Sequence, residues 1–353
     1  MRIKTEIAKI RWYLLLVLFL FVFIFPFCGG GKQGPSGGQE LNAQLAVTEF
    51  DGESGLLLKY LQDQGDYVNS RQFPSMIKAA TVYEELDGNN YVIDLRLPEY
   101  YEMGHIQGAV NIRMSDLADH FENDIVPFQY DKIIFVCYRG HISAYVTCLF
   151  RLLGYGNVYS MRWGMSSWNM EFAKDRWLKG LTNKYADQLE TTTNPKPEPL
   201  YQPVLTTGLS TGAEILNHRV RTLLSAEVEN VFIDDDPVFK NPEDYFIINF
   251  ERRDKYESGH IPGAIRYKPQ GTLGIVSEMA TIPTDRTVVM YCGTGQNSAF
   301  GVAYLRMFGY DARSHNTGNN SFMHKKMLEE REALSWQPFT EEFVNDFPYV
   351  TGK

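Results

Sequence analysis

Short apolar runs alternate with a helical pattern over the first half of the chain. Residues 91–95, 109–112, 132–136 and 157–161 are apolar or β-branched and predict four strands. Between the last two runs, apolar residues recur with the three- and four-residue spacing of an amphipathic helix, at Ile142, Tyr145, Val146, Leu149, Leu152 and Leu153. Strands that alternate with helices predict a parallel sheet covered on both faces.

A second stretch of the chain follows the same order. Residues 245–248, 264–266 and 287–291 are short apolar runs that predict strands of a second unit. Upstream of the first unit, residues 45–86 favour helices, notably at residues 75–86. The predicted fold is α/β, with two tandem domains that are each a parallel β-sheet flanked by helices.

An internal repeat supports this division. Residues 135–143 recur as residues 290–298, so that Cys137 and Cys292 stand 155 positions apart. Other residues keep the same offset, namely Asp94 with Asn249, His105 with His260, and Tyr155 with Tyr310. No insertion or deletion is needed between Asp94 and Tyr155, which indicates a duplicated domain.

Each copy of the repeat delivers a cysteine from a strand into a glycine-containing turn, after which a helix begins. Backbone N–H groups of such a turn, and the positive end of the helix, stabilise a negatively charged sulfur. Cys137 and Cys292 are therefore the candidate nucleophiles of the chain.

Length and composition set the domain boundaries. The 353 residues have room for two domains that each bury a core, and residues 191–205 hold four prolines typical of a semi-rigid linker. We therefore expect domain 1 at residues 45–190 and domain 2 at residues 206–350. A net charge of −9 argues against a nucleic-acid partner, since such partners select basic surfaces.

The amino terminus reads as an export signal. Basic residues from Arg2 to Arg11 precede an apolar run, Tyr13 to Phe25, that is shorter than the roughly 20 residues of a membrane-spanning helix. With Cys28 and the glycine-rich tether at residues 28–44, this signal (residues 1–27) resembles that of a bacterial lipoprotein, which implies lipidation of Cys28 and a membrane-anchored, extracytoplasmic (periplasmic-side) protein. Phe27 departs from that pattern, where a small residue is preferred. An uncleaved anchor and a plain signal peptide remain alternatives.

Several separated motifs resemble the rhodanese family of sulfurtransferases. They are Asp94-Leu95-Arg96, the segment from Gly104 to Ile112, the loop from Cys137 to Ser143, and Trp163-Gly164 followed by Trp168. The resemblance implies that the Cys137 thiolate takes a sulfur atom from a small anionic donor such as thiosulfate, holds it as a persulfide and passes it to a thiol or protein acceptor. No cofactor is implied.

The resemblance also implies that the two loops bind the substrate. The residues concerned are Tyr138, Arg139, Gly140, His141, Ile142 and Ser143 in domain 1, and Gly293, Thr294, Gly295, Gln296, Asn297 and Ser298 in domain 2. We assign structural roles to the Asp94–Arg96 pair and to His105 and His260.

Domain 2 departs from the pattern. Asn249 and Glu251 replace Asp94 and Arg96, and its loop has no cation where domain 1 has Arg139. The loop chemistry therefore favours Cys137, although Cys292 keeps its backbone turn and remains a candidate.

Other activities fit the sequence less well. A phosphatase of the Cys-x5-Arg type is excluded because Ser143 and Ser298 occupy the sixth position. The histidines show no metal-ligand spacing with the cysteines, so no metal site is expected. The remaining alternative is a module that carries sulfur, selenium or tellurium, or a scaffold, for an extracytoplasmic redox system.

Overall fold

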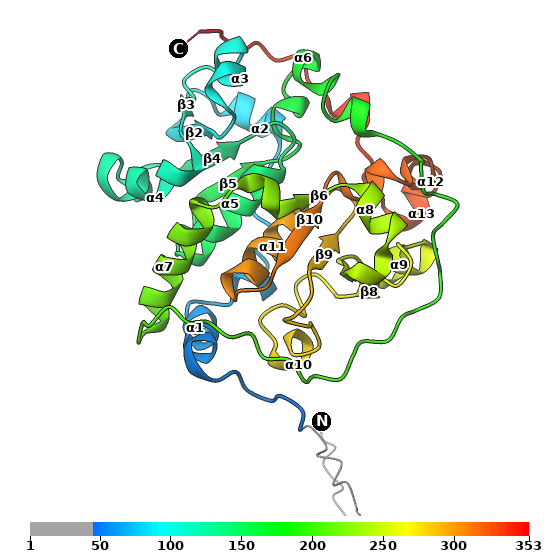
Figure 1. Cartoon of the computed structure of the whole chain (residues 1–353). Helices are drawn as coiled ribbons and strands as arrows, with labels where there is room; N and C mark the ends of the chain where they lie inside the picture. The colour runs from blue at the N-terminus through cyan, green and yellow to red at the C-terminus, as the bar shows by residue number, and fades with distance from the viewer. Residues whose placement is uncertain (1–44, 353) are drawn as a thin grey trace, which may run out of the picture. The chain divides into compact units, whose positions relative to one another are not determined.

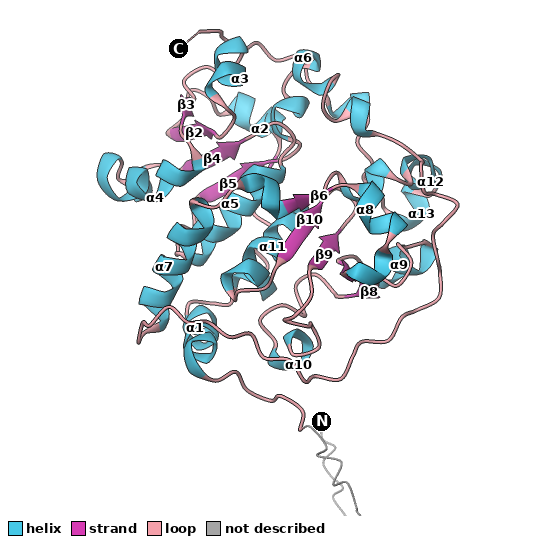
Figure 2. Cartoon of the chain, viewed as in Figure 1, coloured by secondary structure: helices cyan, strands magenta, loops and turns pink. Residues whose placement is uncertain are grey.

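Two parallel sheets form the framework of the chain (Figures 1 and 2). The computed structural model describes residues 45–352, so the predicted signal, Cys28 and the tether lie outside the described residues. The sheets have strand orders β1-β5-β4-β2-β3 and β6-β10-β9-β7-β8, which is the same order in each repeat. The predicted α/β fold with two tandem parallel-sheet domains is thereby confirmed.

The first sheet contains β1 (Met76–Ile77), β2 (Asn90–Asp94), β3 (Val110–Asn111), β4 (Lys132–Val136) and β5 (Val158–Met161). Its central strand, β4, is buried from Ile133 to Val136, as expected for a parallel strand covered on both faces. The prediction of helix at residues 75–86 is wrong for β1, which pairs with β5. Two residues are too few to show the alternation by which a strand is recognised.

The second sheet contains β6 (Phe232–Ile233), β7 (Phe246–Asn249), β8 (Ile265–Arg266), β9 (Val288–Tyr291) and β10 (Ala312–His315). Three of these strands correspond to the predicted runs. The other two, β6 and β10, pair with each other in parallel at the side of the sheet opposite β8.

Helices cover both sheets, and two of them recur with the same bounds at the 155-residue offset of the sequence repeat. Domain 1 has α1 (Gly52–Asp63), α2 (Ala79–Glu84), α3 (Pro98–Met103), α4 (Leu117–Asp119), α5 (His141–Leu152) and α6 (Met170–Ala173). Domain 2 has α7 (Gly212–Leu224), α8 (Asp235–Lys240), α9 (Arg253–Ser258), α10 (Val276–Met279), α11 (Gln296–Met307), α12 (His324–Glu329) and α13 (Arg331–Leu334).

The two helices that follow the cysteine loops, α5 and α11, pack against each other. Helix α5 is buried almost all round rather than along one stripe, and even Thr147 and Arg151 are buried. The predicted amphipathic pattern therefore describes only part of the buried surface of α5, because α11 packs against this helix as well. This contact joins both domains into one continuous hydrophobic core.

The two domains also exchange the segments at their ends. Residue Glu190 forms a two-way backbone bridge with His260 of domain 2, with N···O distances of 3.0 and 2.9 Å. Val350, near the chain end, forms the equivalent bridge with His105 of domain 1, at 3.0 and 2.9 Å. Each domain is thus completed by a segment that the sequence assigns to the other.

No helix within residues 45–352 is both long enough and apolar enough to cross a bilayer.

Substituting Phe347 tests the segment exchange. Its ring stacks on Tyr83 at 4.1 Å between centroids and meets Trp168 edge-on at 5.1 Å, both in domain 1. We expect Phe347→Ala to lower the free energy of unfolding by about 2 kcal/mol, less than for a fully buried phenylalanine. Urea denaturation measures the loss, and hydrogen exchange should locate it in β1 and β5.

Phe128→Ala is the matched control, since that ring is 70% exposed and should change stability by less than about 0.5 kcal/mol. Loss of protection in the domain 2 sheet instead of domain 1 would contradict the exchange.

Candidate active site

The loop after β4 wraps around the sulfur of Cys137. The Sγ atom accepts hydrogen bonds from the backbone N–H groups of Gly140 at 3.2 Å and Ser143 at 3.4 Å, and the thiol lies 3.4 Å from the Ser143 hydroxyl. Gly140 has a φ of 87°, a left-handed conformation that places it at the start of α5 and turns the loop back over the sulfur. The loop therefore supplies donors to a negatively charged sulfur before any substrate binds.

A second glycine holds this loop from outside. Gly164 lies so close that a Cβ atom there would overlap the carbonyl oxygen of Cys137. The next two residues bond the loop carbonyls: Met165 N–H donates to Cys137 O at 2.8 Å, and Ser166 N–H donates to Tyr138 O at 3.2 Å. Because these carbonyls are turned outward, the N–H groups of the loop remain free to face the sulfur.

A cavity of about 180 Å³ opens beside the sulfur. It is lined by Cys137, Tyr138, Arg139, His141, Ile142, Arg176, Phe232 and Asn316. Phe232 and Asn316 belong to domain 2, so both domains enclose this cavity. Three of the lining residues were not predicted as site residues from the sequence, because they lie outside the cysteine loops and belong to no recognisable motif. They are Arg176, Phe232 and Asn316.

Two arginines give the cavity a positive charge. Burial, followed by the charge of Arg176, lowers the pKa of Arg139, while Asp234 and Cys137 act in the opposite direction. A guanidinium nevertheless stays protonated in proteins. Arg139 Nε is buried without a hydrogen-bond partner among residues 45–352. Such an incompletely paired cation beside another arginine is suited to bind an anion.

The loop of Cys292 repeats the first loop in its backbone. The Sγ atom accepts from Ser298 N–H at 3.4 Å and lies 3.6 Å from the Ser298 hydroxyl. Gly295 has a φ of 74°, and a Cβ atom on Gly318 would overlap the carbonyl oxygen of Cys292. The two turns therefore share the left-handed glycine, the serine N–H donor to the sulfur and the close approach of a second glycine.

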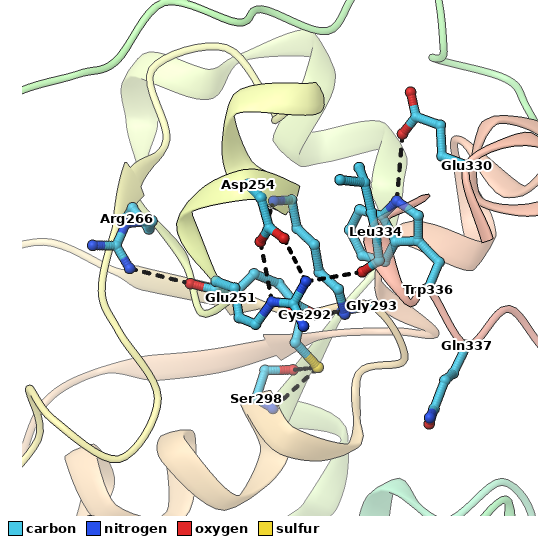
Figure 3. A network of polar contacts seen from close by, with 12 residues as sticks. Glu251, Asp254, Arg266, Cys292, Gly293, Ser298, Glu330, Leu334, Trp336 and Gln337 are labelled. Carbon is cyan, nitrogen blue, oxygen red and sulfur yellow. Dashed lines mark hydrogen bonds and ion pairs between the residues drawn. The ribbon is translucent and has the colours of Figure 1, made fainter. Parts of the chain in front are cut away.

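The charge around Cys292 differs. Figure 3 shows Glu251 beside Gly293 and Cys292, and the Glu251 carboxylate accepts from Gly293 N–H at 2.7 Å. Lys255 is 3.4 Å from the same carboxylate and provides partial compensation. Burial, followed by the negative charge of Glu251, raises the pKa of Cys292. In domain 2 the Glu251 carboxylate thus accepts the N–H of Gly293, which is a backbone donor of the loop. Its negative charge disfavours both the thiolate form of Cys292 and the binding of an anionic substrate.

The two cysteine loops meet across the domain interface. His141, the first residue of α5, lies with Nε2 at 2.9 Å from the carbonyl oxygen of Thr294. Gln296, the equivalent first residue of α11, accepts from Trp163 N–H at 3.1 Å. Thr294 and Gln296, both predicted to bind substrate, thus make these contacts with domain 1, whereas Asn297 Oδ1 is buried without a partner among the described residues.

His141 is neutral at physiological pH. Burial, followed by the charge of Arg139, lowers its pKa to about 3. Since its Nε2 faces a carbonyl, which only accepts, the proton is assigned to Nε2. His141 therefore positions the loop and is unsuited to proton transfer at neutral pH.

The residues assigned structural roles bond to other parts of the protein framework. Arg96 and Asp94 form a buried ion pair with a shortest N···O distance of 2.7 Å, and Arg96 also donates to the Gly104 carbonyl at 2.6 Å. His105 and His260 each place Nδ1 at 2.8 Å from the carbonyl of the tyrosine four residues earlier. Among residues 45–352, no group of three or more His, Cys, Asp or Glu side chains is arranged to hold a metal ion.

Comparison with known proteins gives two matches to the rhodanese-like domain, over residues 78–171 and 236–325, which together make up slightly more than half of the chain. The thiosulfate sulfurtransferase GlpE of Pseudoalteromonas translucida is 33% identical over 100 residues, or 28% of this chain and 91% of that protein. The protein of the same name from Pseudomonas entomophila is 31% identical over 81 residues, or 23% of this chain and 72% of that protein.

Among solved structures, SseA from Escherichia coli, described as a 3-mercaptopyruvate sulfotransferase with the rhodanese fold, is 15% identical with a TM-score of 0.26, over 69% of this chain and 97% of that one. A rhodanese-related protein from Thermoplasma volcanium is 24% identical with a TM-score of 0.24, over 29% and 92%. At these scores the structures add no separate argument. The two domain matches and the GlpE relatives are sufficient: the chain belongs to the rhodanese-like domain family.

Proposed function

We propose that this chain is a sulfurtransferase that moves sulfane sulfur from a thiosulfate-like donor to a thiophilic acceptor through a persulfide on Cys137. The observation that carries the proposal is the position of Cys137 Sγ. It lies under two backbone N–H donors and lines a cavity that also contains Arg139 and Arg176. Family membership and the names of the GlpE relatives support the same reaction class.

The reaction has two steps. The Cys137 thiolate attacks the outer sulfur of thiosulfate, the sulfur–sulfur bond of the donor breaks, and sulfite leaves with the electron pair. The Arg139 and Arg176 guanidiniums bind the donor anion and the departing sulfite. The outer sulfur of the persulfide is then transferred to the acceptor, and Cys137 leaves as a thiolate stabilised by the N–H groups of Gly140 and Ser143.

Cys292 is the secondary candidate under this proposal. Its loop has the same turn, but the Glu251 carboxylate accepts from Gly293 N–H beside Cys292, whereas domain 1 has Arg139 and Arg176 near its cysteine. We propose that domain 2 mainly supports the active site, through Phe232 and Asn316 at the cavity and through the contact between the loops.

We also propose that the protein is exported and anchored to a membrane on its extracytoplasmic side through a lipid on Cys28. This proposal rests on the sequence of residues 1–44 alone. Acceptors would then be thiols or thiol proteins of that compartment.

Intact-protein mass spectrometry after exposure to thiosulfate tests the persulfide. We expect an adduct of about 32 Da, one sulfur atom, on the wild type and on Cys292→Ser, because a covalent intermediate retains the transferred atom. The adduct should be absent from Cys137→Ser. Folded protein without an adduct on any variant would favour the alternative of a scaffold or of a carrier for another chalcogen.

Replacing Glu251 tests the electrostatics of the second loop. Glu251→Gln keeps an acceptor for Gly293 N–H and removes the negative charge that raises the pKa of Cys292, so the pKa should fall. Alkylation of Cys292 by iodoacetamide, followed by peptide mapping against pH, should therefore begin at lower pH than in the wild type. Glu257→Gln, an exposed change of equal charge on α9, should leave the profile unchanged.

Replacing Gln296 tests the support that domain 2 gives to domain 1. Gln296→Ala removes the acceptor of the buried Trp163 N–H, next to the glycine that holds the Cys137 loop. We expect kcat/KM for transfer from thiosulfate to cyanide to fall about tenfold, since small displacements of reacting groups are costly. Circular dichroism checks that the fold is retained, and the exposed Gln188→Ala serves as the control. Unchanged activity in Gln296→Ala would show that the contact has no effect on catalysis.

A further inference from the structure

A second, larger cavity lies against the sulfur cavity. Its volume is about 410 Å³, and it is lined by Arg96, Tyr100, Met103, Tyr138, Met165, Glu171, Phe172, Asp175, Arg176 and Tyr349. Its walls come from α3, from α6 and the residues after it, and from the exchanged chain end, which lie on the same side of domain 1 in Figure 1. Cavities of this size bind organic molecules rather than inorganic anions.

The two cavities adjoin, because Tyr138 and Arg176 line both. The Arg176 guanidinium carbon lies 4.4 Å from the centroid of the Tyr138 ring and 5.0 Å from that of Tyr100. The Tyr138 hydroxyl in turn accepts from Leu97 N–H at 3.1 Å, which fixes the ring. A ligand in the larger cavity thus contacts Tyr138 and Arg176, which also line the Cys137 cavity.

The charges of the larger cavity are of both signs. Arg96 is already paired with Asp94, which leaves Arg176 as the cation available to a ligand among the lining residues. Two exposed carboxylates, Glu171 and Asp175, face the same space, and Glu171 is partly neutralised by Lys174 at 2.7 Å. Aromatic and methionine side chains form the remaining surface.

From this arrangement we infer that the larger cavity binds the sulfur acceptor, and that the acceptor is a small zwitterionic thiol that carries both an ammonium and a carboxylate group. Arg176 binds the carboxylate, Asp175 and Glu171 attract the ammonium, and the apolar wall contacts the carbon chain. The inference rests on the proposed sulfurtransferase activity and specifies its second substrate. Under this inference the donor binds in the cavity beside Cys137 and the acceptor in the larger cavity next to it. Arg176 lines both cavities.

The transfer is balanced without a further reagent. The acceptor thiol loses its proton to solvent, and its thiolate attacks the outer sulfur of the Cys137 persulfide. The bond between that sulfur and Cys137 Sγ breaks, a new bond to the acceptor sulfur forms, and Cys137 leaves as the thiolate. Before the step the acceptor thiolate and the ionised Cys137 persulfide each carry one negative charge. After it the Cys137 thiolate and the acceptor persulfide carry one each. The nearby guanidiniums reduce the repulsion between these charges.

The test compares three thiols as acceptors with the full chain and thiosulfate as donor: L-cysteine, cysteamine, which lacks the carboxylate, and 3-mercaptopropionate, which lacks the ammonium. For the wild type, kcat/KM should be highest for L-cysteine. In Asp175→Asn, and more so with Glu171→Gln added, the ratio of kcat/KM for L-cysteine to that for 3-mercaptopropionate should fall about two- to fivefold, the range expected for exposed charge pairs.

Asp187→Asn removes an exposed carboxylate outside the cavity lining and should keep the wild-type ratio. Equal ratios in all variants would overturn the inference even with full activity towards cyanide.

Binding of S-methyl-L-cysteine, which cannot accept sulfur, separates this inference from the proposed function. Calorimetry should detect binding that weakens in Asp175→Asn. Binding without any sulfur transfer would retain the site and refute the activity. Absence of binding, together with transfer to cyanide, would retain the activity and refute the site.

Discussion

The approach of Gly164 to the Cys137 loop is the constraint on which the active site depends. Only a residue without a Cβ can lie against the Cys137 carbonyl, and only then can Met165 and Ser166 bond the two carbonyls of the loop. With the carbonyls held outside, the N–H groups of Gly140 and Ser143 face the sulfur. Gly318 lies in the same way against the Cys292 loop, so this backbone contact is common to both domains of the chain. The environment that favours a thiolate is thus built from backbone, and side chains set its charge.

Side chains explain why the two copies differ. Domain 1 adds Arg139 and Arg176 near its cysteine, whereas domain 2 adds Glu251, bonded to Gly293 N–H. Because Cys137 and Cys292 are both buried, these charges are weakly screened and act strongly on a thiolate or an anion. The two copies of the turn therefore have similar backbones but different charges around the cysteine. Domain 2 still contributes to the site of domain 1, because its residues Phe232 and Asn316 line the cavity beside Cys137.

The sequence predicted the backbone of the site well and its walls poorly. The Cys137 loop, the helix after it and the repeat were readable because they are local patterns, with apolar runs, glycines and cysteines at fixed spacing. Strand β1 was not predicted because its two residues are too few to show the alternation of apolar and polar positions that identifies a strand. Arg176 was missed because it lies 39 residues beyond Cys137 with no motif around it, and only the packing of α6 brings it to the cavity. The bridge between His105 and Val350 joins residues too distant in sequence for any local pattern to reveal.

The interface also decides the protonation of the site. His141 and Gln296 occupy equivalent positions, yet each makes a different contact with the opposite domain. A charged imidazole at His141 would lie buried beside Arg139, and both burial and that charge oppose protonation. The bond to Thr294 O uses the single proton of the neutral ring, which keeps the histidine as a positioning group. Positive charge at the sulfur cavity is then carried by the guanidinium groups of Arg139 and Arg176. We therefore expect the pH dependence of transfer to reflect the sulfur groups that react, and not His141.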